Sequence, residues 1–350
     1  MKPPELVSIT LEKPYLILVG DEADATNAKT GMGIVHWRPD DVAGQLRFSN
    51  DAVDLGIPDL DIKGAIEKGV ASLVIGVAPI GGSVPDEWWD VMQQAAAAGL
   101  NVICGLHTRL NDNPVLCEAA AKSGAQLIDV RVPPKNLPVG NGIKRSGMRI
   151  LTVGTDCAIG KKYAALSLHA AFRSAGLKST YRATGQTGII ISGEGMPIDA
   201  VVADFVSGAA EVLSPDNDPD HWDIIEGQGS LFHPAYSGVS LGLLHGSQPD
   251  GFVACHDATR KEICGWEHYP LPTIEECIVL HEQAARRTNP NARCVGICVN
   301  TSGLDADRRI PYLEELCHRH DVPAVDPLID GCTELVTHIT ATLSPTPDTR

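Results

Sequence analysis

The sequence predicts an α/β protein made of two successive parallel-sheet domains, and three observations support this. Short apolar runs alternate along the whole chain with Ala- and Leu-rich stretches of helical character. The runs are apolar throughout, as is typical of strands covered on both faces. A single core stops growing near roughly 250–300 residues. The 350 residues of this chain therefore predict two domains.

The first domain is predicted to span residues 1–135 and to be Rossmann-like. A segment rich in Pro, Gly and Lys follows it, and we place a linker at residues 136–147 because such composition punctuates a chain rather than packing into a core. The strands of the first domain are predicted at residues 15–19, 72–77, 101–104 and 126–129, and its helices at residues 61–69, 87–98 and 114–122.

The second domain is predicted to span residues 148–342, with a frayed tail at 343–350. It repeats the alternation of strand and helix, which again favours a parallel sheet. Its strands are predicted at residues 149–153, 179–184, 222–226, 251–256 and 293–300, and its helices at residues 161–175, 197–213, 235–244, 274–287 and 311–320.

The charge balance excludes some partners. The chain carries 28 Lys and Arg against 44 Asp and Glu, a formal net charge of −16. An acidic excess repels nucleic-acid phosphates and anionic lipid headgroups. No apolar run reaches the roughly 18 residues of a membrane span. We therefore expect a small-molecule substrate, no nucleic-acid partner and no membrane partner.

The cysteines predict a reducing environment. The ten cysteines are scattered and include no CxxC pair, and several lie in apolar runs. This pattern indicates buried, reduced thiols and favours a cytoplasmic protein without a metal. Cys294 and Cys298 share strand parity, and packing in the core is favoured for them over metal binding. Enzymes of this size often form symmetric oligomers, so we expect a homo-oligomer.

The most informative stretch runs from residue 149 to 163, RILTVGTDCAIGKKY. An apolar strand leads to a glycine-containing loop, and a helix opens after it, which is the context of a phosphate-binding loop. Backbone N–H groups and the helix N-terminus attract anions there. The residues predicted to bind the cofactor in this loop are Gly154, Thr155, Asp156, Cys157, Ala158, Ile159, Gly160, Lys161 and Lys162.

This loop departs from the standard nucleotide-binding pattern in two ways. Five residues separate Gly154 from Gly160, where the standard spacing has four. Lys162 stands where a Ser or Thr normally holds Mg²⁺. A second ammonium there favours an anion site without a metal. The alternative is an ordinary strand-to-helix turn with surface lysines.

A second polar turn follows the predicted strand at residues 222–226. The strand delivers Glu226 to its carboxyl end, and Gln228, Ser230 and His233 follow in EGQGSLFH. Ligands of α/β sheets bind beyond the carboxyl ends of strands. Glu226 is a candidate Mg²⁺ ligand or general base, although a solvated glutamate at a strand end is the alternative. His233 could share the crevice, although a lone histidine is more often structural.

Four further residues complete the predicted site. Arg182 and Gln186 lie in RATGQTG after another strand, where Arg182 could bind a carboxylate through two hydrogen bonds. Lys29 in the first domain could bind an acidic substrate. Asn300 ends the strand at residues 293–300 and is a candidate contact for an adenine ring, with a turn-forming asparagine as the alternative.

Together these motifs resemble one protein family. The loop GTDCAIGKKY, the turn IIEGQGSL, and the first-domain elements AKTGMG and GVAPIGG are similar to a family of P-loop proteins that includes the D-glutamate N-acetyltransferases. The resemblance covers nearly the whole chain. It implies a Rossmann-like domain followed by a domain like those of P-loop NTPases. The loop also resembles that of dethiobiotin synthetase, but Lys162 lacks the hydroxyl that binds metal there.

The resemblance implies acetyl transfer from acetyl-CoA to the amino group of D-glutamate, in D-glutamate catabolism. Coenzyme A carries phosphates that such a loop could hold without a metal, and its adenine could meet Asn300. The amine must lose a proton before it attacks, so Glu226 or His233 is expected to act as the base. N–H groups of the Gly227–Gly229 turn could stabilise the oxyanion. An acetyl-cysteine at Cys157 is disfavoured because no base for that thiol is evident.

Two alternatives of other classes stay open on the residues. One is an ATP- and Mg²⁺-dependent kinase or ligase resembling dethiobiotin synthetase. The other is a protein that binds a nucleotide or coenzyme A without turnover.

Overall fold

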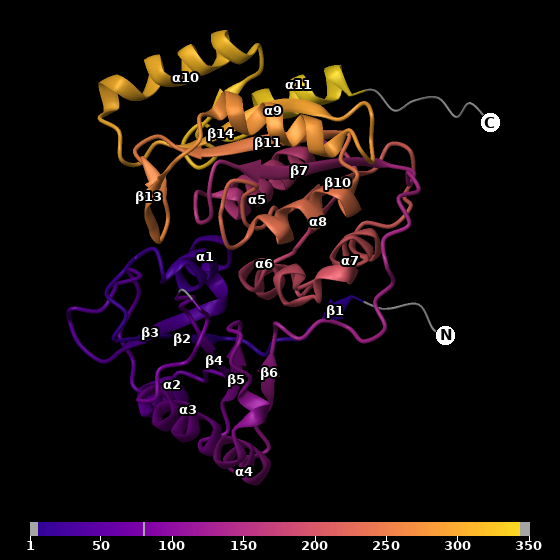
Figure 1. Cartoon of the computed structure of the whole chain (residues 1–350). Helices are drawn as coiled ribbons and strands as arrows, with labels where there is room; N and C mark the ends of the chain where they lie inside the picture. The colour runs from indigo at the N-terminus through magenta and orange to yellow at the C-terminus, as the bar shows by residue number, and fades with distance from the viewer. Residues whose placement is uncertain (1–5, 80, 344–350) are drawn as a thin grey trace. The chain divides into compact units, whose positions relative to one another are not determined.

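The computed structural model describes residues 6–79 and 81–343 (Figure 1). Their contacts form two compact units. The N-terminal unit comprises Val7–Pro133 and Gly185–Ala200. The C-terminal unit comprises mainly Pro134–Thr184 and the described part of Val201–Arg350. The chain thus leaves the C-terminal unit and returns to it at the two ends of one short segment, which the sequence did not predict.

The N-terminal unit is built on a parallel sheet with strand order β3-β2-β4-β5-β6. The strand order turns back between β2 and β4, and ligands of such sheets bind at the carboxyl ends of the strands beside this point. Every residue of β2, β4 and β5 is buried, which explains their continuously apolar sequences. The strands are β2 (Tyr15–Gly20), β3 (Val42–Arg47), β4 (Ser72–Ile75), β5 (Asn101–Cys104) and β6 (Leu127–Asp129).

Helices cover both faces of this sheet. Leu16 and Leu73 of the strands pack with Trp88 and Met92 of α3 in the main core of the unit. On the other face α1 packs closely, since a Cβ on its Gly31 would lie 3.0 Å from Ile17 Cγ2. The short strands β1 (Val7–Ser8) and β9 (Glu194–Gly195) pair antiparallel. The helices are α1 (Lys29–Trp37), α2 (Ile62–Glu67), α3 (Trp88–Ala97), α4 (Pro114–Ser123) and α6 (Gln186–Ser192).

The C-terminal unit is built on a second parallel sheet, with strand order β15-β14-β11-β7-β10-β8. Strand β7 is central and lies between β11 and β10. A hairpin of β12 (Glu262–Ile263) and β13 (Trp266–Pro270) follows β11. The sheet strands are β7 (Met148–Gly154), β8 (Ser179–Arg182), β10 (Trp222–Ile225), β11 (Gly251–Asp257), β14 (Arg293–Asn300) and β15 (Ala324–Val325).

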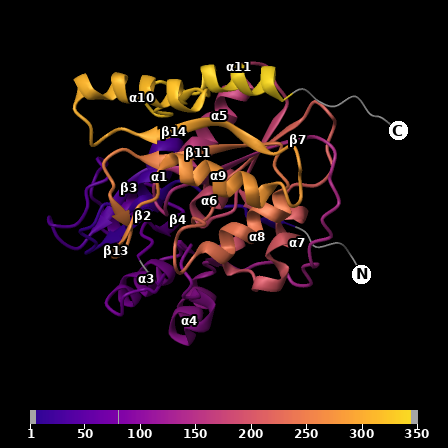
Figure 2. The same cartoon turned by 45° about the horizontal axis from the view of Figure 1, so that its top comes forward.

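The helices of this unit lie in two layers (Figure 2). Helices α5, α10 and α11 lie on one side of the sheet, and α7, α8 and α9 on the other. Their apolar residues, such as Leu168 and Phe172 of α5, are buried. The bounds are α5 (Lys161–Ser174), α7 (Val206–Leu213), α8 (Ser237–Ser247), α9 (Ile274–Ala285), α10 (Ala306–His320) and α11 (Thr333–Thr342).

Some local predictions were wrong. The helix predicted at residues 197–213 is α-helical only from Val206, because Val202 has extended backbone (φ −60°, ψ 136°) between two 3₁₀ turns. Between the helices predicted at residues 161–175 and 197–213, the structure has a further helix, α6, which begins at Gln186. The predicted frayed tail at 343–350 lies outside the described residues, apart from Leu343, which is buried. Within the described residues, no helix is both long and apolar enough to span a bilayer.

Candidate active site

The glycine-containing loop lies between β7 and α5, at the carboxyl end of the central strand. Gly154 begins it, and a Cβ there would lie 2.5 Å from Ile159 Cδ1 and 2.9 Å from the Cys255 carbonyl oxygen. Gly160 precedes α5 with φ +106°, which a larger residue adopts only with strain. The backbone geometry therefore requires glycine at both positions that the sequence singled out.

An arginine that the sequence analysis did not single out holds the loop in shape. Asp156 is fully buried, and its carboxylate accepts hydrogen bonds from Arg260 Nη1 (2.9 Å), Cys264 N (2.8 Å) and Cys157 N (2.6 Å). Arg260 also donates to the carbonyl oxygens of Cys157 (2.7 Å) and Ala158 (3.3 Å). The Asp156 side chain thus faces inward and fixes the loop, since a buried carboxylate needs a partner of opposite charge.

The two lysines at the start of α5 differ in environment. Lys161 is only 7% exposed, and its Nζ donates to the Asp156 carbonyl oxygen at 2.5 Å. Lys162 is half-buried, and its Nζ lies 4.8 Å from the centre of the Tyr163 ring. Lys161 therefore places a buried positive charge at the loop, beside the positive end of the α5 dipole.

Glu226 follows β10 directly and is 4% exposed. Its Oε2 accepts a hydrogen bond from Thr184 N at 3.0 Å, and its carbonyl oxygen accepts one from Thr184 Oγ1 at 2.7 Å. The pKa of Tyr181 is raised well above its ordinary value, mainly by burial and to a lesser extent by the nearby Glu226 carboxylate. Tyr181 thus keeps its proton beside Glu226. The carboxylate has a fixed position at the carboxyl end of the sheet.

The turn after Glu226 packs directly on β7. Gly227 N donates to Thr152 Oγ1 at 2.9 Å, and a Cβ at Gly227 would lie 1.7 Å from the Thr152 carbonyl oxygen. Ser230 Oγ donates to the Thr155 carbonyl oxygen at 3.1 Å and so links the turn to the loop. The N–H of Gly227 already has an acceptor, so it is not available to stabilise an oxyanion. The candidate oxyanion donors of the turn are therefore the N–H groups of Gln228 and Gly229.

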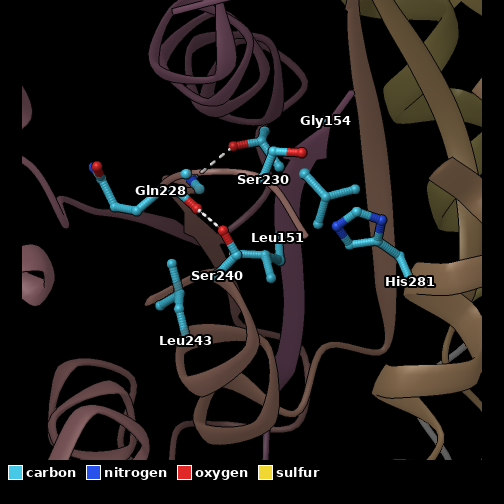
Figure 3. Close-up of a pocket in the computed structure, with 11 residues that line it drawn as sticks. Leu151, Gly154, Gln228, Ser230, Ser240, Leu243 and His281 are labelled. Carbon is cyan, nitrogen blue, oxygen red and sulfur yellow. Dashed lines mark hydrogen bonds between the residues drawn. The ribbon is translucent and has the colours of Figure 1, made fainter. Parts of the chain in front are cut away.

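A small cavity lies behind this turn (Figure 3). Its volume is about 10 Å³, which is room for about one water molecule. The Gln228 side chain extends away from it, and its Nε2 donates to Thr184 Oγ1 at 3.0 Å. His281 closes the other side, and burial lowers the pKa of His281 to about 4. A much larger hollow of about 870 Å³ in the N-terminal unit is lined by none of the predicted site residues.

His233 is buried at the mouth of the loop. Its ring stacks on Tyr236, with centroids 4.4 Å apart, and meets Trp266 edge-on at 4.5 Å. Its Nδ1 accepts a hydrogen bond from Ala235 N at 3.1 Å, while within the described residues its Nε2 has no hydrogen-bond partner. Burial lowers the pKa of His233, and Asp156 and the backbone of Cys264 oppose this effect. The neutral ring therefore carries its proton on Nε2 and is a donor there.

One nitrogen of His233 also lies near two loop side chains. It, a carboxylate oxygen of Asp156 and Cys157 Sγ are all within 4.8 Å of one another. The carboxylate of Asp156 is already engaged by Arg260, whose positive charge opposes a cation at this point. A histidine does lie near the Cys157 thiol, contrary to the sequence-based expectation that no base was evident. However, the tautomer fixed by Ala235 leaves Nε2 protonated, which does not suit it to take the thiol proton.

The structure brings some predicted residues together and separates others. The predicted residues that lie together are at the carboxyl ends of the adjacent strands β7 and β10. They are the loop Gly154–Lys162, Glu226, Gln228, Ser230 and His233. Arg182 lies at the end of β8, where its Nε donates to the buried Asp223 at 2.9 Å. Asn300 lies at the end of β14, where its Nδ2 donates to Asp257 at 3.0 Å. Both side chains thus have partners within the fold.

The remaining two predicted residues belong to the N-terminal unit. Lys29 begins α1 and is half-buried. Gln186 begins α6, and its Oε1 accepts a hydrogen bond from Arg131 Nη2 at 2.7 Å. The roles predicted for all of these site residues stay predictions.

Sequence reasoning missed the residues that support the site. Arg260 and Thr184 lie far along the chain from the groups that they hold, at the loop and at Glu226. The available signal was Asp156 itself, because a carboxylate inside a glycine loop demands a cation. It does not say which of the many arginines supplies it.

Comparisons with known proteins support one family across the whole chain. A family model described as "Domain of unknown function (DUF1611_C) P-loop domain" matches residues 138–336, and one described as "Domain of unknown function (DUF1611_N) Rossmann-like domain" matches residues 47–133. The chain belongs to the DUF1611 family. The predicted fold class, a Rossmann-like domain followed by a P-loop domain, is confirmed.

Relatives in the DUF1611 family extend the match to nearly the full length. A D-glutamate N-acetyltransferase of Tritonibacter scottomollicae is 46% identical over 331 residues, covering 95% of this chain and 99% of the relative. One of a Pseudoalteromonas species is 43% identical over 329 residues, covering 94% and 99%. The crystal structure of a DUF1611 family protein from Anabaena variabilis has a TM-score of 0.85 at 32% identity, covering 95% of this chain and all of that one. The predicted family resemblance is confirmed.

Proposed function

We propose that this protein is a D-glutamate N-acetyltransferase that uses acetyl-CoA. The observation that carries the proposal is the identity of 46% and 43%, over nearly the whole chain, to two proteins of that name. Kinase or ligase chemistry and binding without turnover are not favoured, because neither relative bears such a name. Lys162 in place of a metal-binding hydroxyl also supports chemistry without Mg²⁺ at the loop.

The reaction needs a base beside the substrate amine. The α-ammonium of D-glutamate loses a proton, and its nitrogen attacks the thioester carbonyl carbon of acetyl-CoA. As the tetrahedral intermediate collapses, the C–S bond breaks and the nitrogen loses its second proton, which the departing sulfur takes up to give coenzyme A. We assign the base to Glu226, because its carboxylate is buried, fixed by Thr184 and placed at the carboxyl end of the sheet. Such a base contributes roughly 10²–10⁴-fold.

Replacing the carboxylate tests this role. Glu226→Gln keeps the acceptor for Thr184 N and removes the base, so we expect kcat to fall about 10²-fold or more while the Kd of acetyl-CoA is unchanged. Single-turnover rates and calorimetric binding measure the two quantities separately. Near-normal turnover of the variant would remove Glu226 from the role of base.

The substrate itself is tested by a release assay. The protein is mixed with acetyl-CoA and a panel of D- and L-amino acids, and free thiol and the acetylated product are measured by absorbance and mass. We expect thiol release with D-glutamate. Thiol release that occurs only when ATP is added, or ADP release in the presence of Mg²⁺ and ATP, would support the ligase or kinase alternative.

The setting of the reaction follows from the same proposal. We assign the protein to D-glutamate catabolism because D-glutamate is the proposed substrate, and to the cytoplasm because all ten cysteines are free thiols, as in a reducing compartment. We also propose a homo-oligomer, because many enzymes of this size are symmetric assemblies. Light scattering after gel filtration tests this, and a monomer mass at working concentration would contradict it.

A further inference from the structure

We infer that the loop between β7 and α5 binds the α-carboxylate of the amino-acid substrate, with His233 donating a hydrogen bond to it from Nε2. The phosphates of acetyl-CoA, to which the sequence alone assigned this loop, then bind elsewhere. The inference rests on the proposed function, since it takes Glu226 as the group that receives the amine proton.

The first support is how the turn after the base packs on the first lysine of α5. Gly227 follows Glu226, and a Cβ on Gly227 would lie 3.1 Å from Lys161 Cδ. The turn that follows the base therefore packs against the aliphatic part of the Lys161 side chain, whose Nζ donates to the Asp156 carbonyl oxygen of the loop at 2.5 Å. A general base must lie within hydrogen-bond reach of the proton that it removes. In an α-amino acid the carboxylate is joined to the carbon that bears the amine, so an amine at Glu226 would direct its carboxylate toward the loop that Lys161 borders.

The second support is charge complementarity. Glu226 is buried beside the loop, and Lys162 replaces the hydroxyl that would hold Mg²⁺ between a carboxylate and a phosphate. A phosphate at this point would lie near the Glu226 carboxylate without the Mg²⁺ that normally separates two such groups, and like charges at close range repel. An α-amino acid is a zwitterion. Its ammonium suits Glu226, and its carboxylate suits Lys161 and the N-terminus of α5.

The third support is a donor without a partner. His233 is 1% exposed, and within the described residues its Nε2 has no partner of normal hydrogen-bond geometry, although the Cys264 backbone lies near enough to the ring to oppose the effect of burial on its pKa. Because Nδ1 accepts from Ala235, the neutral ring is a donor at Nε2. A ring nitrogen of His233 lies within 4.8 Å of Cys157 Sγ in the loop. A buried donor left unsatisfied costs stability, which an anionic ligand in the loop would offset.

The length of the cosubstrate agrees with this assignment. The pantetheine arm between the phosphates and the sulfur of coenzyme A has about as many main-chain bonds as four or five residues, so it reaches on the order of 15 Å when extended. The reacting thioester must lie at Glu226, next to the loop. Phosphates in the same loop would require the arm to fold back on itself.

Variants at two loop groups test the inference. Lys161→Met removes the ammonium, and Lys122→Met on exposed α4 is the matched control for a lost lysine. His233→Phe keeps an aromatic ring against Tyr236 and Trp266 but removes the donor, whereas His233→Gln restores an N–H near Nε2. For each, calorimetry gives the Kd of D-glutamate and of coenzyme A, and kinetics give KM for D-glutamate and for acetyl-CoA.

We expect Lys161→Met and His233→Phe to raise the Kd of D-glutamate about 10- to 100-fold, which is the usual effect of losing a hydrogen bond to a charged group. The Kd of coenzyme A should be unchanged. His233→Gln should recover part of the loss. The α-amide of D-glutamate lacks the α-carboxylate, so it should be a poor substrate. Its kcat/KM should be the same for the variants as for the unaltered protein. S-acetylpantetheine lacks the phosphates, so its kcat/KM should be lower than that of acetyl-CoA. The factor between the two should be the same for Lys161→Met as for the unaltered protein.

Other results overturn the inference. If the variants bind coenzyme A more weakly and D-glutamate as before, the loop binds phosphates instead. Equal loss of kcat in His233→Phe and His233→Gln at unchanged KM would make His233 the base. No turnover of any amino acid by the unaltered protein would refute the proposed function instead. The Kd of D-glutamate would then still decide the loop, and absence of binding would refute both.

Discussion

The ion pair between Asp156 and Arg260 gives a quantitative test of how the loop is held. Removing one partner of a fully buried ion pair costs about 3–5 kcal/mol, because the other charge is left buried and unpaired. Arg260 is 19% exposed, so water offsets part of this cost, while Cys157 N and Cys264 N still solvate the carboxylate. For Arg260→Met we therefore expect a loss of about 2–3 kcal/mol in the free energy of unfolding of the C-terminal unit.

Urea unfolding, followed by far-UV circular dichroism and by tryptophan fluorescence, measures this loss. Arg293→Met is the control, because Arg293 is exposed and its removal should stay within about 0.5 kcal/mol. Asp156→Asn and the double variant complete a cycle. We expect a coupling of about 1–3 kcal/mol between the two sites. Costs that add within about 0.5 kcal/mol would refute the idea that Arg260 acts by neutralising Asp156.

Two further predictions concern the sheet behind the site. Gly227→Ala should destabilise the protein by about 3 kcal/mol, because its Cβ would lie 1.7 Å from the Thr152 carbonyl oxygen, whereas Gly238→Ala in α8 meets nothing within 4 Å and should be neutral or stabilising in the same urea assay. If both glycines tolerate alanine alike, the close packing of the turn on β7 is wrong. Burial lowers the pKa of His281 to about 4 from 6.5, so the unfolded chain binds this proton first and stability falls as the pH falls from 6.5 toward 4. Between pH 7 and pH 5 the unaltered protein should lose about 2 kcal/mol more than His281→Gln, and equal losses would contradict a neutral buried ring.

The parts of the site that could be predicted from the sequence are those that one local segment determines. Gly154 and Gly160 are required by the backbone of a single turn, and Glu226 follows a buried strand directly. Periodicity and turn chemistry act over a few residues, so they are visible in the sequence. The two sheets and most of their strands were predicted for the same reason.

Pairings between distant segments could not be predicted in this way. Arg182 looked like a free cation at a strand end, but the neighbouring strand β10 supplies Asp223 to it. The tautomer of His233 depends on a backbone N–H two residues away and on how the turn closes. Such partners follow from strand order and register, which local patterns do not fix. The start of α6 at Gln186 was missed because Thr-Gly-Gln-Thr-Gly has the composition of a loop.

The crossing at Gly185–Ala200 has a consequence for how the chain is made. Strand β1 lies within the first ten residues, yet its partner β9 is Glu194–Gly195. Thr30 likewise forms its 3.0 Å hydrogen bond with Thr187 of α6. A ribosome must therefore synthesise β7, the loop and α5 before the N-terminal unit has all of its own residues. The first unit to emerge is the later one to be completed, so truncation at the linker would yield an N-terminal unit that lacks α6 and β9.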